Sequence, residues 1–188
     1  MNSQQDTLSL SVRQYCENIG QDPMLVQGAG GNVSWKENNK LWVKASGTWL
    51  ANAVREDIFV PVDLLSIQNA IAEDDFDVTP SVLGESALRP SIETLLHALM
   101  PQKVVVHLHA IEVLVHLVKN EFECELDALL TDSINWVSVS YHKPGAGLAK
   151  AVHDALEVSP GANVVFLQNH GVVIGGDHID DINKTLDF

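Results

Sequence analysis

The chain has 188 residues, of which 46% are hydrophobic, and its 11 Lys and Arg against 25 Asp and Glu give a formal net charge of −14. This length and apolar content suit one well-filled α/β domain, so we expect a single domain over residues 1–188, which a longer natural chain could extend at its C-terminus. So acidic a chain is a poor candidate for binding nucleic acid, where affinity comes from clustered Lys and Arg, but it can still form a cationic pocket for one small anion.

The sequence carries no sign of a membrane or secretory destination. No segment approaches the roughly 18 continuous apolar residues that span a bilayer, and the N-terminal MNSQQDTLSL lacks the basic and apolar regions of a signal peptide. Cys16 and Cys124 are isolated, without CxxC spacing, and we interpret both as buried thiols. We therefore expect a cytoplasmic protein that does not contact a membrane.

The first half of the chain alternates helical and extended patterns. Apolar spacing predicts a helix over Leu8–Ile19, which ends near Gly20. The acidic stretch Asp74–Leu88 contains Pro and Gly, so we expect a loop there. Between these segments the patterns predict strands at Val33–Lys36, Leu41–Ala45 and Ile58–Val62, and a helix from Asp63 to about Glu73.

The second half continues the alternation and ends in a hairpin. Glycines around Val172–Ile174 suggest a tight turn at Asn169–Gly171. Several neighbouring strands are joined by turns too short for a crossover, which predicts a mixed sheet with helices on its faces. The expected helices are Pro90–Met100, a segment ending at Val118, Leu148–Leu156 and a start near Asn183, and the expected strands are Val104–Leu108, Ile134–Val139, Val164–Leu167 and Val172–Ile174.

Two histidines share one face of a predicted strand in KVVVHLHAIEVL. His107 and His109 are two residues apart, so their Cα atoms lie about 6.5 Å apart on the same side and their rings can converge. His170, in LQNHGVV at the end of another strand, can supply a third nitrogen. A lone His there would more often be structural, but three imidazoles with an open position make a catalytic zinc site.

Glu93 and a glycine-rich segment flank this histidine set. Glu93, in RPSIETLLH, either suits the positive end of a helix dipole or acts as a general base facing the metal. The segment GAGGN at 28–32 is either a generic turn or a nest of backbone N–H groups for an anion. Ser46, Gly47 and Ser91 could offer further donors to that anion.

The motifs GAGGNVS, KASG, PSIE, HLH and QNHG occur in this order between about Leu8 and the chain end. In this order and spacing they resemble the class II aldolase/adducin family, which includes L-fuculose-phosphate and L-rhamnulose-phosphate aldolases and L-ribulose-5-phosphate 4-epimerase. The resemblance implies a three-layer α/β/α fold with a mixed, mostly antiparallel central sheet. It also implies a zinc-type divalent metal and a ring-shaped homotetramer.

The resemblance assigns roles to single residues. It places His107, His109 and His170 on the metal ligands, Glu93 on the catalytic acid/base, and Asn32, Ser46, Gly47 and Ser91 on the phosphate pocket. In the aldolases of the family the metal binds carbonyl and hydroxyl oxygens of the substrate and stabilises an enediolate while the carboxylate moves the proton. Two departures stand out: Ile92 replaces a second serine, and Glu121–Leu130 contains no match for the tyrosine acid of some members, Tyr141 being the nearest tyrosine.

The sequence therefore predicts a divalent-metal-dependent aldolase that cleaves a small ketose or ketose phosphate by a retro-aldol reaction. A metal-dependent sugar-phosphate epimerase or dehydratase is the enzymatic alternative, and Glu93 favours cleavage because the epimerase branch has Asp there. The non-enzymatic alternative is an adducin-like binding module. The intact set of three histidines argues against that module.

Overall fold

The computed structural model describes residues 3–130 and 134–186 of the chain. Within them, seven strands form one sheet in the order β3-β2-β1-β4-β7-β6-β5, and every neighbouring pair is antiparallel except β5–β6. The prediction of a mixed, mostly antiparallel sheet is confirmed. The strands are β1 (Asn32–Glu37), β2 (Lys40–Lys44), β3 (Phe59–Asp63), β4 (Val104–Leu108), β5 (Trp136–Val139), β6 (Val164–Leu167) and β7 (Gly171–Gly176).

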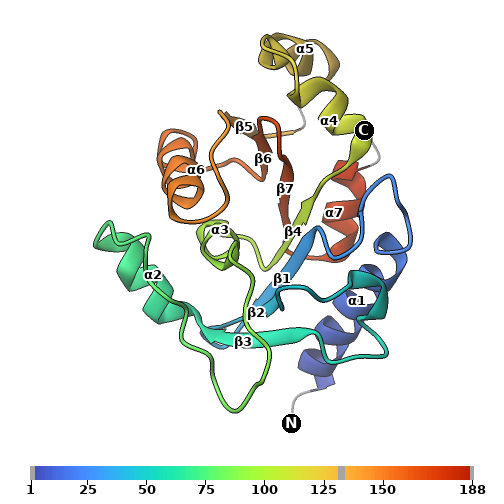
Figure 1. Cartoon of the computed structure of the whole chain (residues 1–188), viewed down its shortest axis with the longest axis vertical. Coiled ribbons are helices and arrows are strands. Elements are labelled where there is room, and N and C mark those ends of the chain that lie inside the picture. The colour runs from blue at the N-terminus through green and yellow to red at the C-terminus, as the bar shows by residue number, and fades with distance from the viewer. Residues whose placement is uncertain (1–2, 131–133, 187–188) are drawn as a thin grey trace.

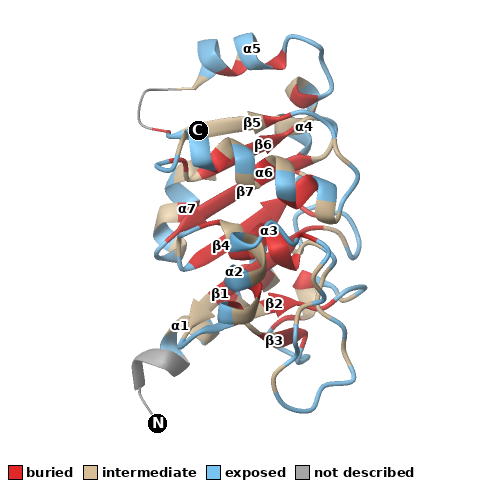
Figure 2. Ribbon diagram, turned by 90° about the vertical axis from the view of Figure 1, so that its left-hand side faces the viewer, coloured by how far each residue is buried: buried red, intermediate tan, exposed pale blue. Residues whose placement is uncertain are grey.

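Helices cover both faces of this sheet, which confirms the three-layer α/β/α arrangement (Figure 1). Helices α2, α3 and α6 lie on one face and α1 and α7 on the other, and the strands between them are largely buried (Figure 2). No helix of the described segments is long and apolar enough to cross a membrane. The helices are α1 (Ser3–Ile19), α2 (Leu64–Ala72), α3 (Thr94–Leu99), α4 (Ile111–Leu117), α5 (Phe122–Leu129), α6 (Ala146–Val158) and α7 (Ile179–Leu186), with a short 3-10 helix at Leu50–Asn52.

Strand β4 lies in the middle of the sheet and is buried along its whole length. Side chains alternate between the faces of a strand. Val104, Val106 and Leu108 therefore join the core under α1 and α7, whereas Val105 joins the core under α3 and α6. His107 shares the face of Val105, so the alternation directs its imidazole toward the layer that contains α3.

The structure corrects the expected start of the helix before β4. We predicted a helix over Pro90–Met100, but α3 begins only at Thr94. Pro90 instead forms an isolated antiparallel bridge with Ala45, and the Ser91 carbonyl accepts the N–H of Thr94 in a turn. This bridge ties residues 89–91 to the end of β2, so the chain cannot coil into a helix before the turn is complete.

Other differences lie near the C-terminal half. Helix α5 was not predicted, because its sequence FECELDAL has three acidic residues among its apolar positions, and only Phe122 and Leu126 become buried. Helix α7 begins at Ile179, earlier than the expected Asn183. Cys16 is buried as predicted, but Cys124 is exposed on α5, so that prediction was wrong.

Candidate metal centre and active site

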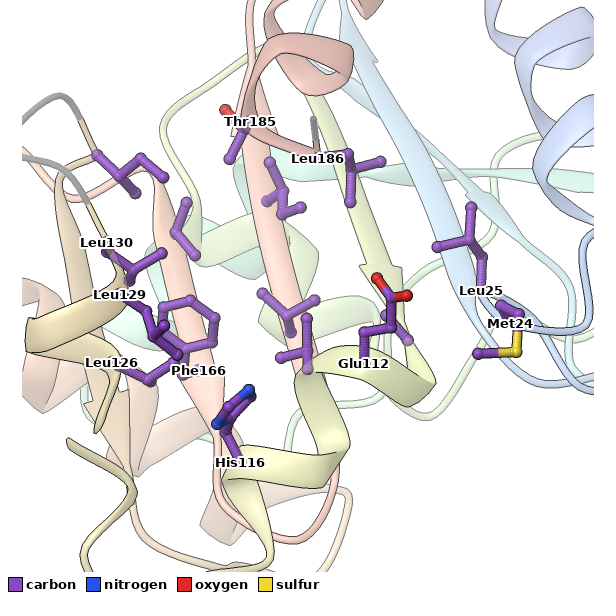
Figure 3. Close-up of a pocket in the computed structure, with 16 residues that line it drawn as sticks. Met24, Leu25, Glu112, His116, Leu126, Leu129, Leu130, Phe166, Thr185 and Leu186 are labelled. Carbon is purple, nitrogen blue, oxygen red and sulfur yellow. The ribbon is translucent and has the colours of Figure 1, made fainter. Parts of the chain in front are cut away.

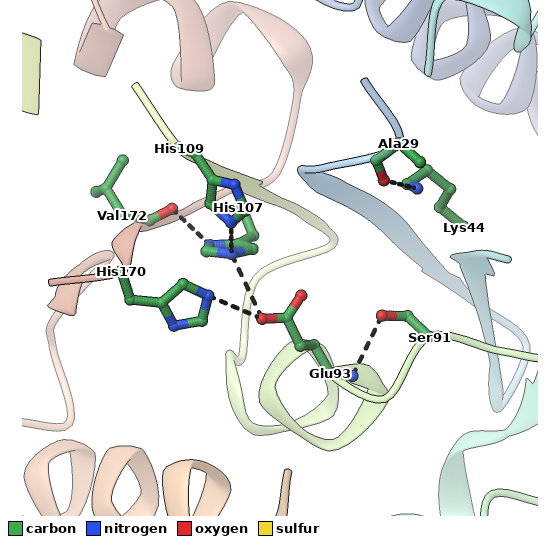
Figure 4. Close-up of polar contacts among 8 residues, drawn as sticks. All are labelled: Ala29, Lys44, Ser91, Glu93, His107, His109, His170 and Val172. Carbon is green, nitrogen blue, oxygen red and sulfur yellow. Dashed lines mark hydrogen bonds and ion pairs between the residues drawn. The ribbon is translucent and has the colours of Figure 1, made fainter. Parts of the chain in front are cut away.

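The three predicted histidines converge at one end of β4 (Figure 4). His107 lies within β4, His109 follows the strand, and His170 precedes β7, whose Val172 pairs with Leu108. One ligand nitrogen from each ring lies within 4.8 Å of the others. The ring centroids are 4.8 to 5.4 Å apart. The structure thus brings together two neighbours on one strand and a residue more than sixty positions away.

The hairpin between β6 and β7 positions His170. Asn169 adopts φ 55°, and the N–H of His170 donates to the Leu167 carbonyl at 3.0 Å. A Cβ at Gly171 would overlap the Leu108 carbonyl oxygen. Glycine at this position therefore lets the start of β7 lie against the end of β4, and that contact brings His170 to the other two histidines.

Glu93 immediately precedes α3 and points into the histidine cluster (Figure 4). Its Oε1 is 3.2 Å from His170 Nε2 and 3.5 Å from His107 Nε2, and its side chain is only 13% exposed. The Ser91 hydroxyl accepts the backbone N–H of Glu93 at 3.2 Å and holds the turn that aims the carboxylate. Glu93, which we predicted to be a general base, therefore places its carboxylate in contact with two of the histidines.

The hydrogen bonds of His107 fix which nitrogen faces the cluster. Its Nδ1 lies 3.1 Å from the Val172 carbonyl, which can only accept, so Nδ1 carries the proton and Nε2 of the neutral ring has a free lone pair. Burial lowers the pKa of His107 to about 4 and also lowers the pKa of His109, so both rings are neutral at pH 7. The lone pair of His107 then faces the Glu93 carboxylate and, at 3.2 Å, His109 Nε2.

The nitrogen atoms of the three histidines could hold a cation beside the Glu93 carboxylate. Burial opposes the ionisation of Glu93, but the hydrogen bond with His170 and the electrostatic influence of His107, His170 and His97, when they are protonated, hold the pKa of its carboxyl below the ordinary value. The cluster therefore presents imidazole lone pairs beside a carboxylate. A nitrogen-rich set with a nearby oxygen fits a divalent ion of the zinc type.

The predicted anion-binding residues lie on segments that meet beside this cluster. Asn32 pairs with His107 across β1 and β4, is 2% exposed, and has a buried Oδ1 that finds no hydrogen-bond partner among the described residues. The N–H of Ser46 donates to the Arg89 carbonyl at 2.9 Å, next to the Ala45–Pro90 bridge. This contact places the turn with Ser46 and Gly47 beside the segment 89–93, which contains Ser91 and Glu93.

Sequence reasoning missed Lys44, the last residue of β2. Its side chain is buried, and its Nζ donates to the Ala29 carbonyl at 3.0 Å and to the Thr48 carbonyl at 2.7 Å. Burial lowers the pKa of Lys44 to about 8, while the charge of Glu93 acts in the opposite direction. The alternation in LWVKA gave no signal for this burial, because it places Lys44 on the face of Trp42, opposite the buried Leu41 and Val43, and Lys is normally exposed.

Ile92, which departs from the family pattern, and Tyr141, the tyrosine nearest to the segment that lacks the expected acid, are both exposed. Ile92 is 69% exposed, so it does not fill the space of a hydrogen-bonding serine inside the pocket. Tyr141 is also exposed, and its backbone N–H lies 3.4 Å from Gln168 Oε1, two residues before His170.

A separate apolar cavity of about 350 Å³ lies between α4, α5, α7 and the sheet (Figure 3). Leu126, Phe166 and Leu186 line it, and Glu112 and His116 are the titratable residues at its edge. None of the residues predicted for the metal, the base or the anion lines this cavity. We therefore place the chemistry at the histidine cluster, which has convergent polar atoms, and not at the apolar cavity.

Comparison with known proteins gives a family for this arrangement. The family described as "Class II Aldolase and Adducin N-terminal domain" matches residues 11–186. The chain is 29% identical over 175 residues to the "Uncharacterized oxidoreductase YuxG" of Bacillus subtilis (strain 168), a match that covers 85% of this chain. It covers only 25% of that protein, so the chain spans about a quarter of the length of this curated relative.

Solved structures share the fold. The N-terminal class II aldolase domain of a conserved protein from Thermoplasma acidophilum is 27% identical, with a TM-score of 0.71, and the match covers 95% of this chain and 92% of that one. An L-fuculose 1-phosphate aldolase is 17% identical with a TM-score of 0.70, and the match covers 100% of this chain and 82% of that one. At this lower identity the second likeness concerns the fold alone.

Proposed function

The chain belongs to the class II aldolase and adducin family, and from this premise we propose that it is a divalent-metal-dependent aldolase that cleaves a small ketose or ketose phosphate. One observation carries the proposal. His107, His109 and His170 converge with the Glu93 carboxylate, and Nε2 of His107, which faces that carboxylate, carries no proton. An adducin-like module that only binds a partner would not need this set of buried acceptors.

The residues of the chain divide the chemistry between them. His107, His109 and His170 would hold the ion, which, when bound, supplies Lewis-acid polarisation of substrate oxygens. Glu93 holds or moves a proton at the substrate carbon beside the polarised oxygen. In cleavage the hydroxyl beside the breaking carbon–carbon bond loses its proton to Glu93 and becomes a carbonyl, and the electron pair of that bond stays with the fragment that contains the original carbonyl carbon. Glu93 then delivers the proton to that fragment.

Glu93 is well placed for this task because its environment controls its charge. The hydrogen bond from the His170 ring and the nearby histidines keep the carboxylate ionised, so it can accept a proton at neutral pH. Its turn is fixed by Ser91, so the carboxylate does not have to be ordered when the substrate arrives. Asn32, Ser46, Gly47 and Ser91 would bind the end of the substrate that does not react.

The reaction type can be tested by the products. The metal-loaded protein should be screened with ketoses and ketose phosphates, and cleavage should yield two carbonyl-containing fragments. An epimerase or a dehydratase would keep the carbon skeleton intact, so an unbroken product would replace the proposed reaction with one of these alternatives. Absence of any stoichiometric divalent metal after equilibration with zinc would overturn the metal site itself.

The role of Glu93 can be tested by an isosteric change. Glu93→Gln should keep the metal and the fold but lose about 10²–10⁴-fold in turnover, the range typical of general acid–base groups. The exposed carboxylate Glu112, on α4, offers a matched control, because Glu112→Gln should leave turnover unchanged. Near-full activity in Glu93→Gln would show that another group is the base, and loss of metal would make Glu93 a ligand.

We also propose that the protein acts in the cytoplasm as a homo-oligomer, most simply a tetramer. The described residues place no tyrosine acid against Glu93, and in a symmetric ring a neighbouring subunit can complete a site. Multi-angle light scattering of the purified chain should give the mass of four chains. A stable monomer at micromolar concentration with full activity would contradict this assembly.

A further inference from the structure

Helix α3 contains a fully buried histidine one turn after Glu93. His97 is four residues beyond Glu93, so the two lie on the same face of the helix, and its backbone N–H donates to the Glu93 carbonyl at 3.3 Å. The Nδ1 atom of His97 lies 2.8 Å from the hydroxyl oxygen of Ser34, which is also fully buried. This hydrogen bond therefore joins the helix that follows Glu93 to strand β1 in the interior of the protein.

Ser34 anchors this bond close to the metal ligands. Strand β1 pairs with β4 so that Asn32 lies opposite His107 and Ser34 lies opposite Val105. Ser34 is therefore two residues along the strands from the level of His107, a distance of about 6.5 Å, and on the same face of the sheet. The bond fixes α3 to the part of the sheet that carries the histidine cluster.

The neighbours of His97 on α3 pack through apolar side chains. Leu95 and Ala98 join one core cluster and Leu96 joins another. Apolar packing has no preferred direction, whereas a hydrogen bond fixes a distance and an angle. Because α3 has only six residues, its position depends on such tertiary contacts. The bond to Ser34 therefore limits how far the start of the helix can rotate or slide over the sheet.

His97 is not the residue that stability alone would favour at this position. Its Nε2 is buried and finds no hydrogen-bond partner among the described residues, and an unsatisfied buried polar atom destabilises a fold. Burial lowers the pKa of His97 to about 3, so the ring is neutral at pH 7 and does not act as a cation beside Glu93. A leucine would fill the same space without an unsatisfied nitrogen. The use of histidine here therefore indicates a role for its directional bond to Ser34.

We propose that His97 is a positioning residue that, through its bond to Ser34, holds the Glu93 carboxylate at the metal centre. Glu93 Oε1 lies 3.2 Å from His170 Nε2, and rotation or sliding of α3 would change that distance. The inference rests on the proposed function for the use of Glu93 in turnover. It does not rest on that function for the orientation of the carboxylate, which can be measured without substrate or metal.

Nuclear magnetic resonance of the metal-free full chain measures this orientation. The imidazole proton in the hydrogen bond between His170 and Glu93 should exchange slowly with water at pH 7, and the loss of its signal in Glu93→Ala identifies it. We expect Ser34→Ala and His97→Leu to lose this signal although Glu93 is intact. Ile182→Val, at a fully buried position of α7 on the other face of the sheet, is the matched control and should keep it.

Turnover by the metal-loaded protein gives the second measurement. Ser34→Ala should lower kcat about tenfold and His97→Leu about ten- to hundredfold, because a displacement of about 1 Å can cost about a hundredfold in rate. KM and metal content should not change. When Glu93→Gln is also present, the same two substitutions should lower kcat less than about twofold, since no base remains to be misplaced.

Three results would overturn the proposal. The first is a His170 signal that is absent from the unchanged protein or that persists in Ser34→Ala, which removes only a hydroxyl and so tests the bond even where His97→Leu does not fold. The second is an equal fold-loss of kcat with and without Glu93→Gln. The third is loss of the signal in Ile182→Val as well, which would reduce the role of His97 to general stability.

Failure of the proposed function would look different. A protein that cleaves no ketose but loses the His170 signal in Ser34→Ala and His97→Leu, and keeps it in Ile182→Val, would support the positioning role of His97. That result would overturn the cleavage reaction alone.

Discussion

The two ends of the central strands differ in how their polar groups are matched. At the end with His107, His170 and Glu93, two acceptor atoms, His107 Nε2 and Glu93 Oε1, face each other at 3.5 Å beside the hydrogen bond between His170 and Glu93. At the opposite end, the Lys36 ammonium donates to the carbonyls of Met100 and Gln102, so donors and acceptors are paired within the chain. That second end borders a hollow of about 860 Å³. Neither a buried charge nor a large hollow marks the site, whereas unmatched acceptors do.

Removing one histidine should abolish metal binding at the first end of the strands and leave the hydrogen bonds of Lys36 at the second end intact. His109→Ala leaves two imidazoles, which hold zinc poorly, so we expect loss of stoichiometric metal and of all metal-dependent activity. Inductively coupled plasma mass spectrometry of the dialysed protein measures this. His116→Ala is the control, because His116 pairs with Glu125 on α5 outside the cluster. Retained metal in His109→Ala would place the ion elsewhere.

The substitution Gly171→Ala should disturb the histidine cluster by moving the backbone at the start of β7. The added Cβ would overlap the Leu108 carbonyl oxygen, so β7 must move away from β4 and carry His170 with it. We expect a loss of about 3 kcal/mol or more in the free energy of unfolding, together with weaker zinc binding. Urea denaturation and zinc titration measure the two effects.

Gly147 is the matched control for this substitution. It lies in α6, and a Cβ there would meet nothing within 4 Å, so Gly147→Ala should stabilise the protein by about 0.5–1 kcal/mol. Unchanged zinc affinity in Gly171→Ala would mean that the hairpin does not position His170.

Acid should destabilise the metal-free protein through its buried neutral histidines. Burial lowers the pKa of His97 to about 3 and that of His107 to about 4, from an ordinary value of 6.5. Between pH 6.5 and about 4 the unfolded chain therefore binds more protons than the folded chain, so stability is full above pH 6.5 and is lost as the pH falls. We expect a loss of about 3–4 kcal/mol between pH 7 and pH 5, roughly half of it from each histidine.

Urea titrations of the metal-free protein at several pH values measure this slope. His97 donates to or accepts from the Ser34 hydroxyl at 2.8 Å and is fully buried, so His97→Gln should reduce the slope by about half. A stability that does not change between pH 7 and pH 5 would contradict the neutral state of these rings. Bound zinc should oppose the loss, because the ion competes with protons for the imidazoles.

The smallest expected effect concerns the second end of the sheet. Lys36→Met removes the donor for the Met100 and Gln102 carbonyls and should cost about 1–3 kcal/mol of stability without changing metal content or turnover. The exposed Lys103 nearby is the control, since Lys103→Met should change stability by less than about 0.5 kcal/mol. Lost metal in Lys36→Met would mean that the two ends are coupled.

Much of the fold could be predicted because its signals are local. The strand Val104–Leu108 was predicted with its observed bounds, since a run of apolar residues between Pro101 and a helical pattern allows few alternatives. The hairpin at Asn169–Gly171 followed from its glycine and is confirmed by the positive φ of Asn169. The start of α3 was wrong, because the bridge between Pro90 and Ala45 joins segments 45 residues apart, which no local pattern reports.

The sequence by itself determined that His107 and His109 face the same side, because side chains two residues apart on a strand must do so. Only the tertiary structure decided that His170 and Glu93 reach them, since β7 lies beside β4 and α3 packs on that face. The tertiary structure also decided that Lys44 is buried, because its two carbonyl partners, Ala29 and Thr48, come from the loop before β1 and the loop after β2. Short-range periodicity determines the direction of a side chain, and long-range packing determines its neighbours.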